Sequence, residues 1–177
     1  MDGLYKNKYR IDSARLSSWD YGSNGMYFIT ICTDHMLPYF GPIDKPGVMF
    51  SKVGDYAHQC WKSIPRHFPF VQLDQFIIMP NHIHGILCIL KQSCSGWHPN
   101  QFGPQSQNVA SIIRGFKCAV KTYATRHSID FHWQTRYYDR IIKNGHQLNR
   151  VRNYIANNPR KWLAERMTME KNGCRDA

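Results

Sequence analysis

Two histidines separated by one residue, His82 and His84, have the clearest chemical potential in the sequence. They follow the turn signal Pro80-Asn81 inside a hydrophobic segment, so we expect residues 82–89 to form a β-strand after a tight connection. Successive strand side chains point to opposite faces, so both imidazoles face one way while the aliphatic residues between them face a core. Two such imidazoles can hold a metal ion from one side and leave other positions open for a substrate. The alternative is a pair of ordinary strand histidines, and neither interpretation names a reaction.

The rest of the chain predicts the elements that position this pair. Hydrophobic periodicity predicts strands at 26–33, 76–79, 82–89 and 133–143, and helices at 51–64, 108–126 and 146–157. The loop at 34–48 is expected to include a short hairpin. Asn158 and Pro159 are expected to end the last helix, with Asn158 as the N-cap of another. This order predicts an α+β, ferredoxin-like fold, a four-stranded antiparallel sheet with helices packed on one face and the other face left for the histidines.

The length of 177 residues suits one domain. We expect a basic N-terminal arm at 1–24, a catalytic domain at 25–166 with a mobile loop at 91–107, and a frayed tail at 167–177. No apolar run approaches the ~20 residues that span a bilayer, and the first residues do not form a signal peptide. Six cysteines without a C-x-x-C pair suggest reduced thiols. The sequence therefore predicts a soluble protein that stays inside the cell, with no membrane partner.

The composition predicts a polyanionic partner. The net charge is +11 and aromatic residues make up 14% of the chain, a combination that suits phosphates and unpaired bases. A basic enzyme without a nucleic-acid partner is the alternative. Two groups of cations are candidates for DNA contact, one opposite the apolar stripe of helix 108–126 and one in the N-terminal arm. They are Arg114, Lys117 and Lys121, and Lys6, Lys8 and Arg10.

One of the ten tyrosines, Tyr154, lies on the flank of the apolar stripe of helix 146–157, in line with Gln147 and Arg150. There its hydroxyl could reach the histidine face, and Arg150 joins the candidates for DNA contact. Tyr137 and Tyr138 stay open as alternatives. A tyrosine has a pKa near 10, so as a nucleophile it needs something that stabilises the phenolate.

Four ordered blocks together resemble the single-tyrosine HUH transposases, in particular the branch associated with repetitive extragenic palindromes (REP) of bacterial genomes. The blocks are residues 79–85 (Met-Pro-Asn-His-Ile-His-Gly), residues 111–117, Trp133-Gln134 with Tyr137-Tyr138, and Tyr154-Ile155 with Asn158-Pro159. The resemblance implies cleavage and rejoining of single-stranded or hairpin DNA through a 5′-phosphotyrosine intermediate. It implies Tyr154 as the nucleophile and His82 and His84 as ligands of Mg²⁺ or Mn²⁺. Asn158 stands where insertion-sequence relatives have a third, glutamine ligand, so it is either a ligand or a helix cap.

Two other functions stay open. The first is a hairpin nucleic-acid binding protein of the same fold with little or no cleavage activity. The second is a metal-dependent hydrolase of small molecules, disfavoured because Ile86 stands where a histidine-triad enzyme needs a third histidine. For the transposase, the expected partners are palindromic DNA elements, the expected location is the cytoplasm in association with the nucleoid, and the chain acts as a monomer or a homodimer.

Overall fold

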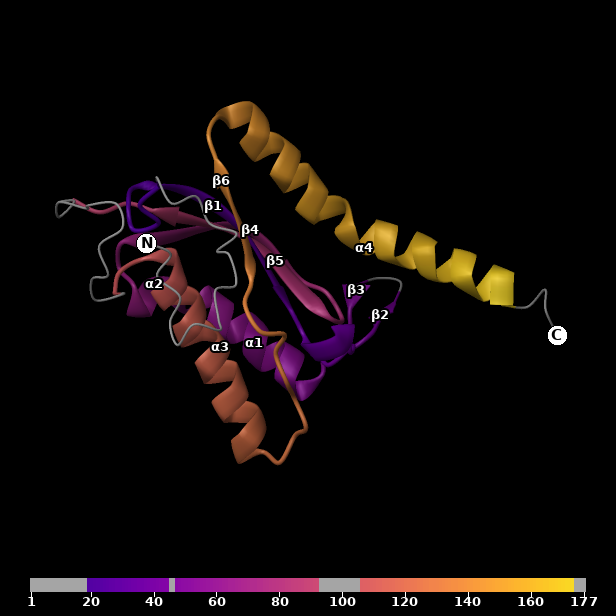
Figure 1. Ribbon diagram of the computed structural model, residues 1–177. Helices are drawn as coiled ribbons and strands as arrows, with labels where there is room; N and C mark the ends of the chain where they lie inside the picture. Colours follow the sequence, from indigo (N-terminus) through magenta and orange to yellow (C-terminus); the bar gives the residue numbers. More distant parts are fainter. Residues whose placement is uncertain (1–18, 45–46, 93–105, 174–177) are drawn as a thin grey trace, which may run out of the picture.

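A four-stranded antiparallel sheet forms the centre of the molecule, as predicted (Figure 1). The computed structural model describes residues 19–44, 47–92 and 106–173. The sheet has the order β4-β5-β1-β6. Its strands are β1 (Gly25–Cys32), β4 (Val71–Ile78), β5 (His82–Ile89) and β6 (Tyr138–Ile142). A separate hairpin of β2 (Ile43–Asp44) and β3 (Gly47–Val48) confirms the one expected in the loop before the first helix.

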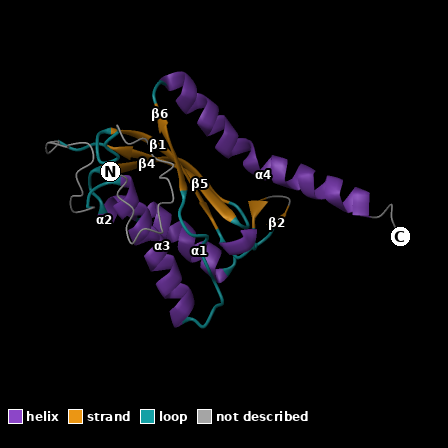
Figure 2. Ribbon diagram, in the orientation of Figure 1, coloured by secondary structure: helices purple, strands orange, loops and turns teal. Residues whose placement is uncertain are grey.

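Three helices cover one face of the sheet (Figure 2). They are α1 (Lys52–Lys62), α2 (Ile64–His67) and α3 (Val109–Arg126), and a 3-10 turn, η1 (Asp34–Met36), follows β1. The Ser51 hydroxyl accepts from the Gly54 backbone N–H and starts α1, while Asn108 and Ser111 cap α3 reciprocally. The main core fills the space between these helices and the sheet.

Strand β5 alternates as its sequence predicts. Ile83, Leu87 and Ile89 are fully buried in the main core, and the histidines face the other way. Gly85 also faces the helices, and a Cβ there would overlap ring carbons of the buried Trp61. A glycine at this position therefore lets α1 approach the sheet closely.

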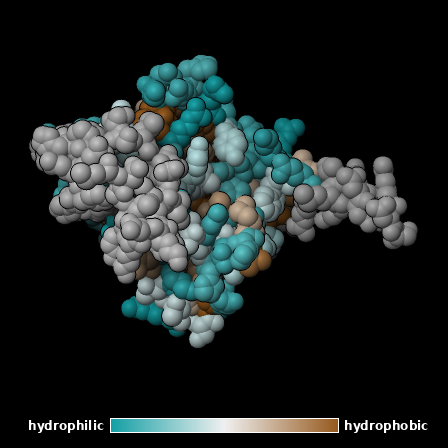
Figure 3. Space-filling view, in the orientation of Figure 1, coloured by the Kyte–Doolittle hydropathy of each residue, from teal (hydrophilic) through white to brown (hydrophobic). Residues whose placement is uncertain are grey.

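Helix α4 (Gly145–Gly173) crosses the opposite face of the sheet, the face that carries the histidines. Its first half packs through Leu148, Val151 and Ile155 onto a smaller cluster that includes Ile86 and Ile142. In Figure 3 the outer surface of this half is hydrophilic, as expected for a helix that buries one stripe. The histidine face, which the sequence analysis left open, is thus partly covered by the helix that carries Tyr154.

The predicted end of this helix at Asn158-Pro159 is wrong. Helix α4 continues through Pro159, and its axis bends near the middle (Figure 1). A proline inside a helix removes one backbone hydrogen bond and bends the axis, and the packed side chains before it keep the helix in place. The tail predicted to fray from residue 167 is likewise helical as far as Gly173.

Other boundaries also differ from the prediction, and β4 begins at Val71 instead of residue 76. The strand expected at 133–143 begins at Tyr138, because Trp133 forms only an isolated bridge with Thr33 and Arg136 has a positive φ of 73° between them. In the predicted arm, Trp19 and Tyr21 pack against the main core. The rest of that arm, including Lys6, Lys8 and Arg10, and most of the predicted loop at 91–107 lie outside the described residues.

Candidate active site

His82 and His84 lie side by side on the histidine face, with 9% and 5% of their surfaces exposed. Their ring centroids are 4.5 Å apart. Strand alternation accounts for this placement, because both belong to β5 and are separated by one residue. The sequence-based prediction that the two rings share one face is confirmed.

The His84 ring is held at both nitrogens. Its Nδ1 lies 2.9 Å from the Thr30 hydroxyl of β1, and its Nε2 lies 3.3 Å from the Tyr154 hydroxyl of α4. A ring protonated at Nδ1 donates to Thr30 and accepts from Tyr154, so one tautomer satisfies both contacts. Burial, with a smaller effect of the neighbouring His82, lowers the pKa of His84 to about 3. The ring is therefore neutral at neutral pH and keeps a lone pair on Nε2.

The His82 ring is oriented by the turn that precedes β5. Its Nδ1 donates to the Asn81 side-chain oxygen at 2.7 Å, and the Asn81 amide nitrogen donates to the Met36 carbonyl at 3.0 Å. Burial lowers the pKa of His82, and a hydrogen bond with Asn158 opposes that effect. Because Asn81 occupies Nδ1, Nε2 is the nitrogen that faces Asn158. Sequence reasoning treated Asn81 as a turn residue and missed its role beside the histidine.

Asn158 is buried, with 8% of its surface exposed, and lies one helical turn after Tyr154. Residues four apart share a helix face, so α4 directs Tyr154 and Asn158 to the same side, toward His84 and His82 respectively. The interpretation of Asn158 as a helix cap is wrong, because it sits inside a continuous helix. Its predicted role as a third metal ligand stays a prediction.

The Tyr154 ring packs against the sheet, yet the residue stays partly exposed. Its ring packs edge-on against Phe28 of β1, with centroids 6.0 Å apart, and 42% of the residue is exposed. The Lys161 ammonium lies 5.9 Å from the Tyr154 ring centroid, and Trp162 packs near His82 with centroids 6.1 Å apart. Sequence reasoning missed Phe28, Lys161 and Trp162, although Lys161 stands seven residues after Tyr154 and so on the same helix face.

An ion pair ties the first half of α4 to the sheet edge. The Arg152 Nε and a terminal nitrogen donate to the two carboxylate oxygens of Asp74 at 2.9 and 2.6 Å. This bond lowers the pKa of the Asp74 carboxyl. Asp74 lies in β4 where the register with β5 shifts, between Leu73 and Phe76. The pair joins residues 78 positions apart, which no local pattern signals.

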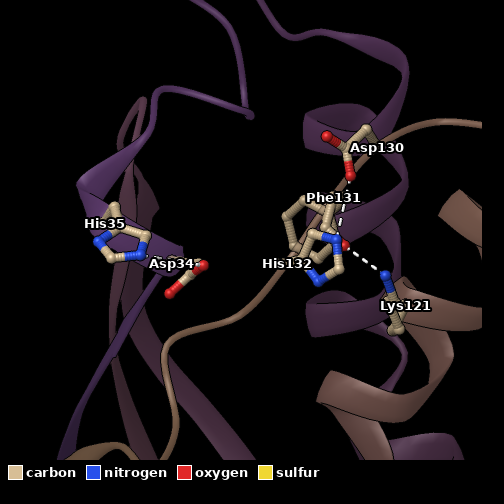
Figure 4. Close-up of polar contacts among 6 residues, drawn as sticks. All are labelled: Asp34, His35, Lys121, Asp130, Phe131 and His132. Atoms are coloured by element: carbon tan, nitrogen blue, oxygen red, sulfur yellow. Dashed lines mark hydrogen bonds and ion pairs between the residues drawn. The ribbon is translucent and has the colours of Figure 1, made fainter.

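The cations predicted on α3 lie away from this site. The Lys117 ammonium donates to the carbonyls of Gln134 and Arg136 at 2.7 and 3.0 Å, and burial lowers its pKa. The Lys121 ammonium donates to the Phe131 carbonyl at 2.6 Å, a contact drawn in Figure 4 beside the His132–Asp130 pair. Both lysines thus fasten the segment before β6 to α3, a role that sequence reasoning missed, and these bonds do not test their predicted contact with phosphates. Arg114 on α3 and Arg150 on α4 are exposed, and their DNA contact stays a prediction.

Two features are absent from the parts of the chain that the structure describes. Those parts contain no group of three or more His, Cys, Asp or Glu side chains that could hold a metal ion. They also contain no helix long and apolar enough to cross a membrane.

The chain has the fold of the single-tyrosine HUH transposases. A solved REP-associated tyrosine transposase bound to a REP hairpin matches with a TM-score of 0.58 and 16% identity, over 85% of this chain and 74% of that chain. A proposed transposase from Deinococcus radiodurans matches with a TM-score of 0.44 and 15% identity, over 83% of this chain and 97% of its own.

Sequence comparison adds a relative. An uncharacterized protein of Haemophilus influenzae is 38% identical over 167 residues, which is 89% of this chain and 93% of that protein. The chain belongs to the same family as this protein. No family model matches the sequence.

Proposed function

We propose that the protein is a transposase that cleaves and rejoins single-stranded or hairpin DNA, with Tyr154 as the nucleophile. The observation that carries the proposal is the 3.3 Å contact between the Tyr154 hydroxyl and His84 Nε2, made within one chain. The fold supports it, because one solved structure similar to this chain is a REP-associated tyrosine transposase bound to a REP hairpin. The net charge of +11 suits a DNA substrate.

The reaction follows from the groups at the site. The Tyr154 oxygen attacks a backbone phosphorus, the bond from phosphorus to the 3′-oxygen breaks, and a 5′-phosphotyrosine and a free 3′-hydroxyl result. The phenolic proton passes to water, and the departing 3′-oxygen takes up a proton from water, so the step is balanced. In the metal-free site His84 Nε2 accepts the phenolic hydrogen bond and so keeps the Tyr154 oxygen beside the histidine pair, and a metal ion bound to Nε2 would take the place of that bond. Because one ester replaces another, a 3′-hydroxyl can reverse the step and rejoin the strand.

The residues present fit a divalent cation. Both imidazoles are kept neutral by burial, so both retain a lone pair, and the Asn158 amide adds an oxygen. A bound Mg²⁺ or Mn²⁺ would polarise a phosphate oxygen and take up negative charge that develops in the transition state. Mg²⁺ prefers oxygen ligands and keeps several waters, so with two imidazole nitrogens at the site we expect Mn²⁺ to bind more tightly than Mg²⁺.

The same chemistry indicates the partners and the location. Because Tyr154 meets His84 in the same chain, one chain supplies the nucleophile and both histidines. We therefore expect activity as a monomer, on palindromic DNA that folds into hairpins, in the cytoplasm and in association with the nucleoid.

The test is the formation of a covalent adduct. A hairpin DNA with single-stranded flanks and a fluorophore at its 3′ end is incubated with the protein and Mg²⁺ or Mn²⁺, then resolved in SDS. The 5′-phosphotyrosine link retains the labelled fragment, so an SDS-stable band is expected with the unmodified protein and none with Tyr154→Phe. Tyr137→Phe is the matched control and should retain the band. Hairpin binding without any adduct under both metals would contradict cleavage and favour the hairpin-binding protein.

A further inference from the structure

The edge strand β6 extends the histidine face by one more strand. In the sheet register Tyr138 is directly opposite Thr30 of β1, and Thr30 is directly opposite His84 of β5. Directly opposite residues point to the same face, so Tyr138 and His84 lie in one row across the sheet. Two strand spacings separate them, which is about 10 Å. The next row brings Arg140 opposite Phe28, the residue on which the Tyr154 ring packs.

Both β6 side chains are accessible. Tyr138 is 62% exposed, more than Tyr154, and Arg140 is also exposed. Neither side chain makes a hydrogen bond, ion pair or ring contact with another described residue. A large aromatic side chain that packs against no described ring, beside a candidate active site, is available to stack with a ligand.

The charge at this edge has one sign. Arg140 points out on the histidine face, and the exposed Arg136 and Lys143 flank β6 in sequence. Asp139 is directly opposite Ile29, which is buried in the main core, so this acidic residue faces the helices instead. The outward surface of β6 therefore offers an aromatic ring and a guanidinium side by side, with no acidic residue of the strand between them.

We propose that Tyr138 and Arg140 form a nucleotide subsite for an unpaired base that flanks the scissile phosphate. The base stacks on the Tyr138 ring, and the phosphate next to that base pairs with the Arg140 guanidinium. Stacking on an aromatic side chain tolerates any base, and Arg provides a planar, permanently charged phosphate partner. The position beside the scissile phosphate rests on the proposed function, whereas the binding of single-stranded DNA at this edge does not.

The experiment measures single-stranded DNA binding without cleavage. The probe is a twelve-nucleotide oligothymidylate that contains one 2-aminopurine, a fluorescent base whose emission is quenched when it stacks on a ring. It is titrated into the Tyr154→Phe protein, which cannot cleave it by the proposed route. Tyr138→Ala should weaken binding about tenfold and remove most of the quenching, because stacking contributes about 1–3 kcal/mol per base. Tyr138→Phe retains the ring and should bind within about twofold. Arg140→Gln should reduce the slope of log affinity against log salt by about 0.7.

Matched controls use the helical face. Phe50, an exposed aromatic that packs on His58 of α1, and Arg66, an exposed cation of α2, lie in the layer away from the site. Phe50→Ala and Arg66→Gln should leave affinity, quenching and salt slope unchanged. Equal affinity and equal quenching in Tyr154→Phe with and without Tyr138→Ala would overturn the subsite. A melting temperature of the Tyr138→Ala variant low enough to explain its weaker DNA binding by unfolding would overturn it too. If Tyr138→Ala loses the quenching while the unmodified protein forms no covalent adduct, the subsite is supported and the cleavage proposal is contradicted.

Discussion

The ion pair between Asp74 and Arg152 should determine how firmly the tyrosine-bearing half of α4 is held on the sheet. The two Arg152 nitrogens donate one to each carboxylate oxygen of Asp74, and the side chains of Asp74 and Arg152 are 18% and 42% exposed. Fully exposed pairs contribute roughly 0–1 kcal/mol, and breaking a buried pair costs roughly 3–5 kcal/mol. For this partly exposed bidentate pair we expect Asp74→Asn to cost about 1.5 kcal/mol, which corresponds to about a tenfold change in an equilibrium constant.

Two measurements show where in the molecule the free energy of the ion pair acts. In hydrogen exchange at neutral pH, the amides of the first half of α4 should exchange about tenfold faster in Asp74→Asn, because the helix leaves the sheet more often. In chemical denaturation, the stability gap between the two proteins should depend on pH. Arg152 lowers the pKa of Asp74 in the folded state, so the unfolded chain binds a proton more readily. The ion pair therefore stabilises the fold fully above pH 3.8, the ordinary pKa of this carboxyl, and less as the pH falls below that value. The difference in unfolding free energy between the unmodified protein and Asp74→Asn should disappear in that acidic range.

A control and a refuting result complete the test. Asp55 on α1 accepts a hydrogen bond from Gln59 of the same helix. Asp55→Asn therefore removes one carboxylate but breaks no contact between a helix and the sheet. It should leave exchange in α4 unchanged. Identical α4 exchange and identical stability at neutral pH in Asp74→Asn and the unmodified protein would show that apolar packing alone holds the helix.

Four further outcomes follow from contacts described above. Tyr154→Phe should bind Mn²⁺ more tightly in calorimetry, because the His84 Nε2 lone pair can accept the phenol or bind a metal but not both at once; equal affinity would contradict this. His84→Ala should abolish adduct formation while hairpin affinity stays within about threefold, and loss of both would indicate a histidine that contacts DNA. Lys117→Met should lower the unfolding free energy by about 1–3 kcal/mol, since its ammonium bonds to backbone carbonyls, and an unchanged salt slope of DNA binding would show that Lys117 contacts no phosphate. Gly85→Ala should destabilise by about 1–3 kcal/mol in denaturation, because the added methyl overlaps Trp61, and a neutral effect would mean that the ring can move aside.

The sheet and the histidine pair were predictable because their signals are local. Alternation along 82–89 specifies which residues face the core, and the turn at Pro80-Asn81 specifies the strand pair. The position of Tyr154 on the flank of an apolar stripe was also readable, since Leu148, Val151 and Ile155 pack as predicted.

The errors concern features that depend on contacts distant in sequence. Asn158 before a proline has the local signature of a helix cap, but its burial beside His82 belongs to the tertiary structure. The hydrogen bonds of Lys117 and Lys121 to carbonyls of the segment before β6 were missed for the same reason, because they depend on the path of that segment. The Asp74–Arg152 pair has no periodic or compositional signature at all.

The placement of Tyr154 and both histidines in one chain has a kinetic consequence. If an active site needs a helix from a second molecule, its abundance falls with the square of the protein concentration once dimers dissociate. Here the encounter between Tyr154 and His84 is intramolecular, so its effective concentration is set by the fold and not by the number of molecules. On the proposed function, we therefore expect the fraction of assembled sites, and so the rate per molecule, to be independent of the protein concentration.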